Sequence, residues 1–293
     1  MTTVLHFLLL DWLGTEKPCL TFGLRGVSYF KLEVSGPGQD LHSGIFGGAV
    51  HEPMTDLFSI MSKLVDQKGR IMIPGIYDQV AKLTEEEKNR LNAVDFNLKD
   101  FQDAFGGKGT IYDNEFDTLA HRWRYPSLSL HGIEGAFYSP GSKTVIPAKV
   151  IGKFSIRSVP NMKPKEITRL VTEYIKSEFS KLDTKNTFKI SCDHAGESWV
   201  ADVNHFNYRA AEEAIKQVYG TQPDYTREGG SIPVTLVFQN ELQKNVMLLP
   251  LGCADDGAHS INEKIDIRNY IQGIKLLGAY LYQLASKSDE IPK

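Results

Sequence analysis

Polar residues alternate with aromatic and β-branched ones over residues 27–34 (VSYFKLEV), and this two-residue period predicts a β-strand. A Gly/Pro break and the turn-rich segment DLHSGIFGG follow the strand. After that segment, apolar residues recur at steps of three and four, which predicts a helix with one apolar stripe. The residues of this stripe are Val50, Met54, Leu57, Met61 and Leu64.

The same two periods return further along the chain. Strands are predicted at 128–137, 145–156 and 187–191, and a helix is predicted to begin at Pro164, where the missing N–H does no harm. The order over 27–191 is therefore strand, helix, strand, strand, helix, strand. That order predicts a ferredoxin-like sheet with two helices on one face.

Residues 66–125 interrupt this order with weaker signals. They contain a charged helix candidate at 83–91 and a glycine-rich stretch at 106–109. We therefore expect an insertion there rather than a separate domain.

The pattern changes after Trp199. Helices are predicted at 206–219 and 234–242, followed by a mostly apolar run at 245–251, which is typical of a strand buried on both faces. The loop GCADDGAHS comes next, and a strand followed by a loop rich in Gly, Asp and His is typical of the ligand edge of an α/β sheet. Only one strand is evident in this part, so the fold class we predict is an incomplete α/β sheet beside the ferredoxin-like α+β domain.

Length and charge limit the classes of protein that remain. The chain has 293 residues, which suits about two domains, and a net charge of −3 with no basic run, so we expect no nucleic-acid partner. No apolar run approaches the roughly 20 residues of a membrane span, and we expect no membrane contact. The three cysteines are odd in number and widely spaced, which suits a reducing compartment and predicts a cytoplasmic location.

Two histidines lie in loops where chemistry is plausible. His42 lies in DLHSG between a strand and a helix, where an ordinary surface turn is the simpler interpretation. His259 follows the buried strand in ADDGAHS, where an imidazole suits zinc and nearby carboxylates could orient it. The alternative for that loop is a helix start at which Asp255 or Asp256 caps backbone amides.

Arginines and glycines supply the other candidates. The segment Arg227–Ser231 (REGGS) combines a cation, a carboxylate and bare amides before a helix, an arrangement that can hold an anion. Arg157 ends the strand KFSIR, where a guanidinium can grip a carboxylate through two hydrogen bonds, although a surface charge is the commoner case. Thr144 and His194 are weaker candidates, one before a strand and one after it.

Taken together, several strings in the chain resemble the M20 family of metallopeptidases, in its carnosine dipeptidase and cytosolic non-specific dipeptidase branch. The strings run from LTFGLRG through DLHSG-x-FGG-x-VHEPMTDL, HRWRYPSLSLHGIEGAF, KTVIP and GKFSIR-x-VPNM to TREGGSIPVTL and ADDGAHS-x-NEK. The resemblance implies a catalytic domain with a two-metal site, interrupted by a lid that forms the homodimer. It divides the chain into a catalytic remnant (1–26), a lid (27–197) and the C-terminal part of the catalytic domain (198–293).

The resemblance also implies roles for individual residues. His259 matches a zinc ligand, and His42 matches the lid histidine that stabilises the oxyanion in the partner subunit's site. Thr144 is similar to a second lid group offered across the dimer, and Arg157 resembles the arginine that holds the substrate's terminal carboxylate. The positions that match the lining of the substrate pocket are His194, Glu228, Gly230 and Ser231.

The family hydrolyses dipeptides with two metal ions, zinc or manganese, and a glutamate base. Of five expected ligands only His259 has a counterpart here: one aspartate would fall at Leu9, and Asp11 lies two residues further on, about 6.6 Å along a strand. We therefore expect a truncated metallodipeptidase that is inactive alone. The alternative is a catalytically silent chain that forms a mixed dimer with a full-length dipeptidase and regulates it.

Overall fold

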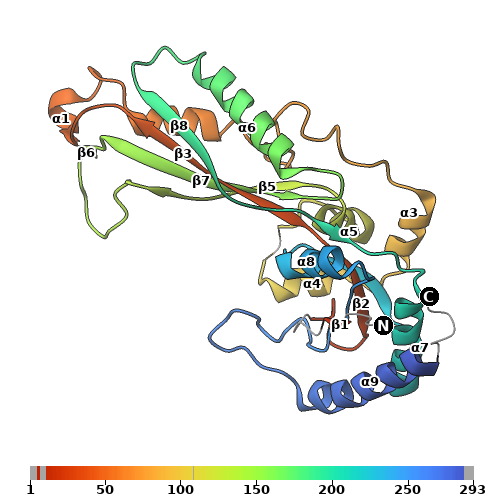
Figure 1. Cartoon of the computed structure of the whole chain (residues 1–293). Helices are drawn as coiled ribbons and strands as arrows, with labels where there is room; N and C mark the ends of the chain where they lie inside the picture. The colour runs from red at the N-terminus through yellow and green to blue at the C-terminus, as the bar shows by residue number, and fades with distance from the viewer. Residues whose placement is uncertain (1–4, 7–10, 108, 287–293) are drawn as a thin grey trace. The chain divides into compact units, whose positions relative to one another are not determined.

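The computed structural model describes residues 5–6, 11–107 and 109–286, which form two compact units. Unit 1 contains the described parts of Met1–Leu24, Lys82–Arg124 and Trp199–Lys293, and unit 2 contains Arg25–Ala81 and Tyr125–Ser198. Each unit has its own sheet and its own hydrophobic core (Figure 1). Within the described ranges, no helix combines the length and the apolar character that a bilayer crossing requires.

Unit 2 is built on a four-stranded antiparallel sheet. Its strands are β3 (Gly26–Ser35), β5 (Ser127–Glu134), β7 (Lys149–Ser158) and β8 (Thr187–Gly196). They lie in the order β5-β7-β3-β8, and β3 pairs with β7 without a break along its whole length. The first strand of this sheet along the chain, β3, thus lies between the third and the fourth, β7 and β8. This is the ferredoxin-like order, and the predicted fold of this part is confirmed.

Two helices cover one face of this sheet, α2 (Pro53–Met61) and α6 (Pro164–Phe179), and each begins with its proline in the first turn. Alternate residues of β3 point toward them and are fully buried: Phe30, Leu32 and Val34. Helix α2 passes close over Gly152 of β7. A Cβ at that position would lie 2.9 Å from Leu57 Cδ1 and closer still to Met61 Sδ, so the packing needs a glycine.

The strand predicted at 145–156 is divided in the structure. Its first residues form the short strand β6 (Val145–Ile146), which pairs with β4 (Leu41–His42). Strand β4 leads into the short helix α1 (Ser43–Phe46). Pro147 has no N–H for a ladder hydrogen bond, and β7 begins only at Lys149. The strands predicted at 128–137 and 187–191 correspond to β5 and to β8, which continues to Gly196.

Residues 66–125, expected as one insertion, are divided between the units. Ile71, Ile73 and Ile76 pack into the core of unit 2. Three helices of the segment belong to unit 1: α3 (Glu85–Asn92), α4 (Leu98–Ala104) and α5 (Glu115–Trp123). The predicted charged helix is α3, and it starts with a reciprocal cap in which Thr84 and Glu87 each bond the other's backbone N–H.

Unit 1 contains a mixed five-stranded sheet. Its strands are β1 (Leu5–His6), β2 (Cys19–Leu24), β9 (Trp199–Val200), β10 (Asp224–Glu228) and β11 (Met247–Leu248). The order is β1-β11-β2-β10, with β9 paired to β2. The expectation of one strand from Trp199 onward is corrected, because β9 and β10 also lie there; β10 (DYTRE) is mostly polar and β9 has only two residues. Strand β2, near the start of the chain, is buried at all six residues and shows no alternation.

Helices cover both faces of this sheet around β11. Met247 and Leu249 pack with α7 (Phe206–Tyr219) and α9 (Ile267–Ser286), which lie side by side (Figure 1). Val246 and Leu248 instead pack with residues of α8 (Pro233–Leu242). The predicted burial of this run on both faces is therefore confirmed, although the regular strand is only two residues long.

Candidate active site

The carboxyl end of β10 opens on a cavity of about 740 Å³ within unit 1. Glu228 is the last residue of β10, and Gly230 and Ser231 follow it in the connection to α8. All three line the cavity, and so does His259 from the loop after β11. The structure thus brings together four of the residues singled out in the sequence, at the sheet edge where α/β proteins commonly bind ligands.

The pairing of β10 with β2 sets the direction of its last side chains. The parallel register shifts between Thr226 and Arg227, so that Arg227 lies opposite Gly23. A Cβ at Gly23 would lie 2.9 Å from Arg227 Cγ, and the glycine therefore leaves room for the stem of the arginine. Because adjacent strand residues point to opposite faces, Arg227 turns away from the side on which Glu228 meets the cavity.

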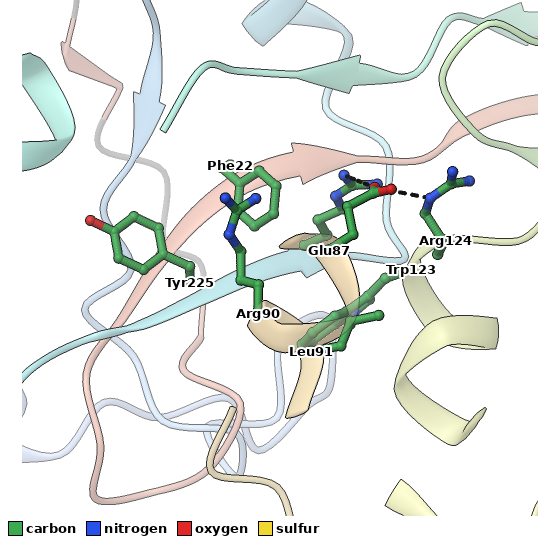
Figure 2. Close-up of a pocket in the computed structure, with 8 residues that line it drawn as sticks. Phe22, Glu87, Arg90, Leu91, Trp123, Arg124 and Tyr225 are labelled. Carbon is green, nitrogen blue, oxygen red and sulfur yellow. Dashed lines mark hydrogen bonds and ion pairs between the residues drawn. The ribbon is translucent and has the colours of Figure 1, made fainter. Parts of the chain in front are cut away.

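Glu87 of α3 holds the guanidinium of Arg227 from the other side (Figure 2). Its Oε1 accepts hydrogen bonds from Arg227 at 3.1 Å and from Arg124 Nε at 3.0 Å. The two arginine side chains are only 14% and 6% exposed. Burial raises the pKa of Glu87, but the amide of Thr84 and the two guanidinium charges together bring it below its ordinary value.

A small cavity of about 20 Å³ adjoins this cluster, lined in part by Phe22, Leu91 and Trp123 (Figure 2). The guanidinium carbons of Arg90 and Arg227 lie 5.3 and 5.0 Å from the centre of the Phe22 ring. At these cation–π distances the Phe22 ring packs against the faces of both guanidiniums. The edges of the guanidiniums pair with the carboxylates of Glu86 and Glu87. The cluster therefore joins α3 firmly to the strand that ends at Glu228.

His259 is exposed and has a φ of +66°, a conformation that residues other than glycine rarely adopt. The neighbouring Gly257 also has a positive φ, +68°. Two left-handed residues in so short a loop turn the chain sharply toward the cavity that His259 lines. Such conformations are found where surrounding structure or function holds a side chain in place.

Asp11 lines the same cavity, and its surroundings disfavour its charge. Burial, followed by the charges of Asp256, Glu263 and Asp255, raises the pKa of Asp11 to about 6, against a smaller opposing effect of Lys264. The carboxylates of Asp11 and Asp256 both border Gly252, where an added Cβ would lie 2.8 Å from Asp256 Oδ2 and closer to Asp11. The sequence analysis set Asp11 aside as a metal ligand because it lies two residues beyond the matching position. Its acidic neighbours, more than 240 positions away, were not evident from the sequence.

The described residues do not fit a pair of metal ions. Among them, the one group of three donors close enough to share an ion is Cys253, Asp255 and Asp256, and His259 is not part of it. Lys264 already pairs with Asp255 and Asp256, at 3.2 and 3.0 Å, and Asp256 also accepts from the backbone of Cys253. A two-ion site needs several imidazole and carboxylate ligands converging at bonding distance, and that convergence is not found in 11–107 and 109–286. Leu9 lies outside the described residues.

Arg122, the second-to-last residue of α5, also lines the cavity. Its guanidinium carbon lies 4.6 Å from the ring centre of Phe101 and 5.8 Å from that of Phe96. Burial lowers the pKa of Arg122, and the attraction of Glu228 opposes this shift. No local pattern singles out this residue in the sequence, because Glu228 is more than 100 positions away.

In unit 2, His42 and Thr144 lie next to each other on the exposed end around β4. His42 pairs with Val145, and the amide of Ser43 donates to the carbonyl of Thr144 at 3.1 Å. The ring Nδ1 of His42 accepts from the amide of Gly44 at 3.0 Å, which places the proton of the neutral imidazole on Nε2. Both side chains are exposed.

Arg157 and His194 lie on the neighbours of β3 in the same unit. Arg157 of β7 is opposite Val27, and His194 of β8 is opposite Tyr29. Arg157 alternates with the buried Ile156 and Ser158, and a register shift in β8 after Cys192 brings His194 opposite Tyr29. Both residues therefore lie on the face of the sheet away from α2 and α6. The structure brings these two residues to one face, separately from the end that carries His42.

Comparison with known proteins agrees with this architecture. The model of the M20 peptidase dimerisation domain matches residues 22–183. The chain belongs to the M20 peptidase family, in its dipeptidase branch.

Particular relatives are similar over almost the whole chain. The Cys-Gly metallodipeptidase dug1 of Schizosaccharomyces pombe is 56% identical over 277 residues, covering 94% of this chain and 58% of the relative. The structure of the dipeptidase Dug1p from Saccharomyces cerevisiae superposes with a TM-score of 0.90 at 51% identity, over 97% of this chain and 58% of the other. The structure of human carnosine dipeptidase 1 superposes with a TM-score of 0.87 at 46% identity, over 94% of this chain and 58% of the other. The chain thus spans a little over half the length of these relatives.

Proposed function

We propose that this protein acts in the hydrolysis of dipeptides, as a subunit of an M20 metallodipeptidase. The observation that carries the proposal is the convergence of Glu228, Gly230, Ser231 and His259 on one cavity at the carboxyl end of β10. Relatives about 50% identical are named as metallodipeptidases, which supports peptide hydrolysis as the reaction class.

In this proposal the cavity binds the substrate. The carboxylate of Glu228 suits the amino group of a dipeptide, and the hydroxyl of Ser231 and the amide of Gly230 suit its polar backbone atoms. The resemblance gives His194 and Arg157 of unit 2 roles in substrate binding as well, with Arg157 as the residue that holds the terminal carboxylate. These roles follow the family resemblance residue by residue.

A divalent metal, zinc or manganese, belongs to the proposal because the relatives are metallopeptidases. His259 is the residue of this chain that would contribute to holding it. Since the described donors do not fit a two-ion site, the family's two-ion chemistry is not assigned to them.

Unit 2 would form a dimer, as the dimerisation-domain match supports. His42 would then present its Nε2–H to the partner subunit's site, where a hydrogen-bond donor stabilises a developing oxyanion, with Thr144 beside it. The three cysteines are free thiols, which supports a reducing compartment such as the cytoplasm.

Purified protein incubated with zinc or manganese and with Cys-Gly or β-Ala-His tests the proposal directly. Hydrolysis by the chain itself, which would overturn the expectation of an inactive chain, gives wild-type turnover that falls at least 100-fold in His259→Ala. The matched control is His51→Ala, because His51 is also an exposed loop histidine but lies in unit 2 away from any cavity described. Equal turnover by the two variants would remove His259 from the mechanism.

A second candidate function is favoured by the poor fit to two ions. The chain could be catalytically silent and act by forming a mixed dimer with a full-length dipeptidase. Mixing it with the S. pombe relative then changes the relative's turnover and gives a dimer of intermediate mass. The chain alone shows no turnover. If neither the chain alone nor the mixture shows an effect, both functions are excluded.

A further inference from the structure

The guanidinium of Arg122 is exceptional within unit 1. The other described arginines of this unit each donate to an oxygen of the chain; they are Arg90, Arg124, Arg209, Arg227 and Arg268. In the described part of the chain, Arg122 has contacts with two aromatic rings and an attraction to Glu228, but no hydrogen-bond acceptor. A guanidinium has five N–H donors, and those of the half-buried Arg122 have no acceptor among the described residues.

The packing holds the faces of Arg122 and leaves its edges available. Phe101 and Phe96 lie within cation–π distance of the guanidinium carbon, and α4 and the turn before it carry these rings. An arginine stacked in this way has lost much of its rotamer freedom before any ligand arrives. It is therefore preorganised to donate in the plane of the guanidinium.

The position of Arg122 identifies the place of that ligand. The residue lines the 740 Å³ cavity together with Glu228, Ser231 and His259. It also lines a neighbouring cavity of about 570 Å³, whose wall includes Asp95, Asp100 and Asp224. Glu228, whose attraction acts on Arg122, lines only the first of these two cavities.

A positive and a negative group side by side on one cavity wall match a zwitterion. A dipeptide carries an ammonium group at one end and a carboxylate at the other, and planar guanidinium edges are well suited to a carboxylate. We propose that Arg122 binds a carboxylate of the substrate in this cavity. The proposal rests on the proposed function. The carboxylate is either the side chain of an acidic residue or the C-terminal group, and in the second case Arg122 takes the role that the resemblance gives to Arg157.

Calorimetric titration of the full chain with four peptides tests this without any turnover. Gly-Gly carries a terminal carboxylate, Gly-Gly amide carries none, Gly-Glu amide carries one only in its side chain, and Gly-Gln amide is the neutral match. We expect the wild type to bind one carboxylate peptide more tightly than its neutral match. In Arg122→Gln we expect the affinity for that peptide alone to fall tenfold or more. Which pair shows the preference distinguishes the terminal from the side-chain carboxylate.

Two further variants control for folding. Arg122→Lys keeps the charge but not the planar fork, and we expect a partial loss of affinity with unchanged thermal stability. Arg70→Gln removes an exposed arginine of unit 2 and should bind all peptides as the wild type does. Three results would overturn the proposal. The wild type binds both peptides of each pair equally, it binds no peptide at all, or Arg122→Gln loses affinity for charged and neutral peptides alike. Carboxylate-selective binding without hydrolysis would keep it and refute only catalysis by this chain.

Discussion

Glu87 and Arg227 lie 140 residues apart in the sequence, yet the carboxylate of one accepts a hydrogen bond from the guanidinium of the other at 3.1 Å. Because Arg227 immediately precedes Glu228, this ion pair fixes the end of the strand that opens on the candidate active site. Arg124 shares the same carboxylate oxygen. One carboxylate of α3 therefore pairs with two largely buried cations next to the site.

Glu87→Gln should destabilise unit 1 strongly. The substitution removes the carboxylate charge that Arg124 and Arg227 share, and breaking a buried pair of this kind typically costs about 3 kcal/mol or more. Glu86→Gln is the matched control, because Glu86 pairs with Arg90 at 2.7 Å but is 74% exposed, and such pairs contribute about 0–1 kcal/mol. All three tryptophans, Trp12, Trp123 and Trp199, belong to unit 1, so urea unfolding followed by tryptophan fluorescence measures it selectively. Similar losses in the two variants would contradict this reading of the cluster.

Asp11→Asn should stabilise unit 1 at neutral pH and have little effect at pH 4. The pKa of Asp11 is raised from 3.8 to about 6 in the folded state, so the folded chain binds a proton that the unfolded chain releases between these values. Stability conferred by this group is therefore complete below about pH 4 and is lost as the pH rises through 6.

After allowance for partial exposure, the expected gain of Asp11→Asn at pH 7 is about 1–2 kcal/mol. The measurement is urea unfolding by tryptophan fluorescence at pH 4 and pH 7. A variant less stable than the wild type at pH 7, or a gain of equal size at both pH values, would show that Asp11 is stabilised as a carboxylate.

Gly152→Ala should destabilise unit 2 by about 1–3 kcal/mol through overpacking. The new methyl group would press against Leu57 and Met61 of α2, both in the core of the unit. The control is Gly132→Ala on β5, where an added Cβ meets no atom within 4 Å, and we expect a change near zero. Circular dichroism during thermal unfolding measures both, and equal melting temperatures for the two variants would contradict the close approach of α2.

Local periodicity was sufficient to predict much of the fold. The helix expected at 206–219 is α7 with the same bounds, and the alternation at 27–34 lies within β3. Both segments are amphipathic, so the spacing of their apolar residues indicates which face is buried. The strand β2 was missed for the opposite reason: it is buried on both faces, and no alternation distinguishes it.

The candidate site was only partly predictable. Glu228 precedes two glycines just before a predicted helix, and His259 lies in a glycine-containing loop after a predicted strand; both are local patterns that the sequence displays. Arg122 and Asp11 acquire their significance from partners far along the chain, Glu228 for the first and Asp256 for the second. No spacing rule links such residues, because their proximity is created by the packing of α5 and of the chain around Asp11 on the sheet.

Counting the zinc bound by the purified chain after equilibrium dialysis, with metal analysis per chain, tests the central claim most directly. His259 is the one imidazole on the cavity wall among the described residues, and the cluster of Cys253, Asp255 and Asp256 is engaged by Lys264. We therefore predict at most one zinc per chain, and none for His259→Ala. Two tightly bound ions per chain would contradict the account.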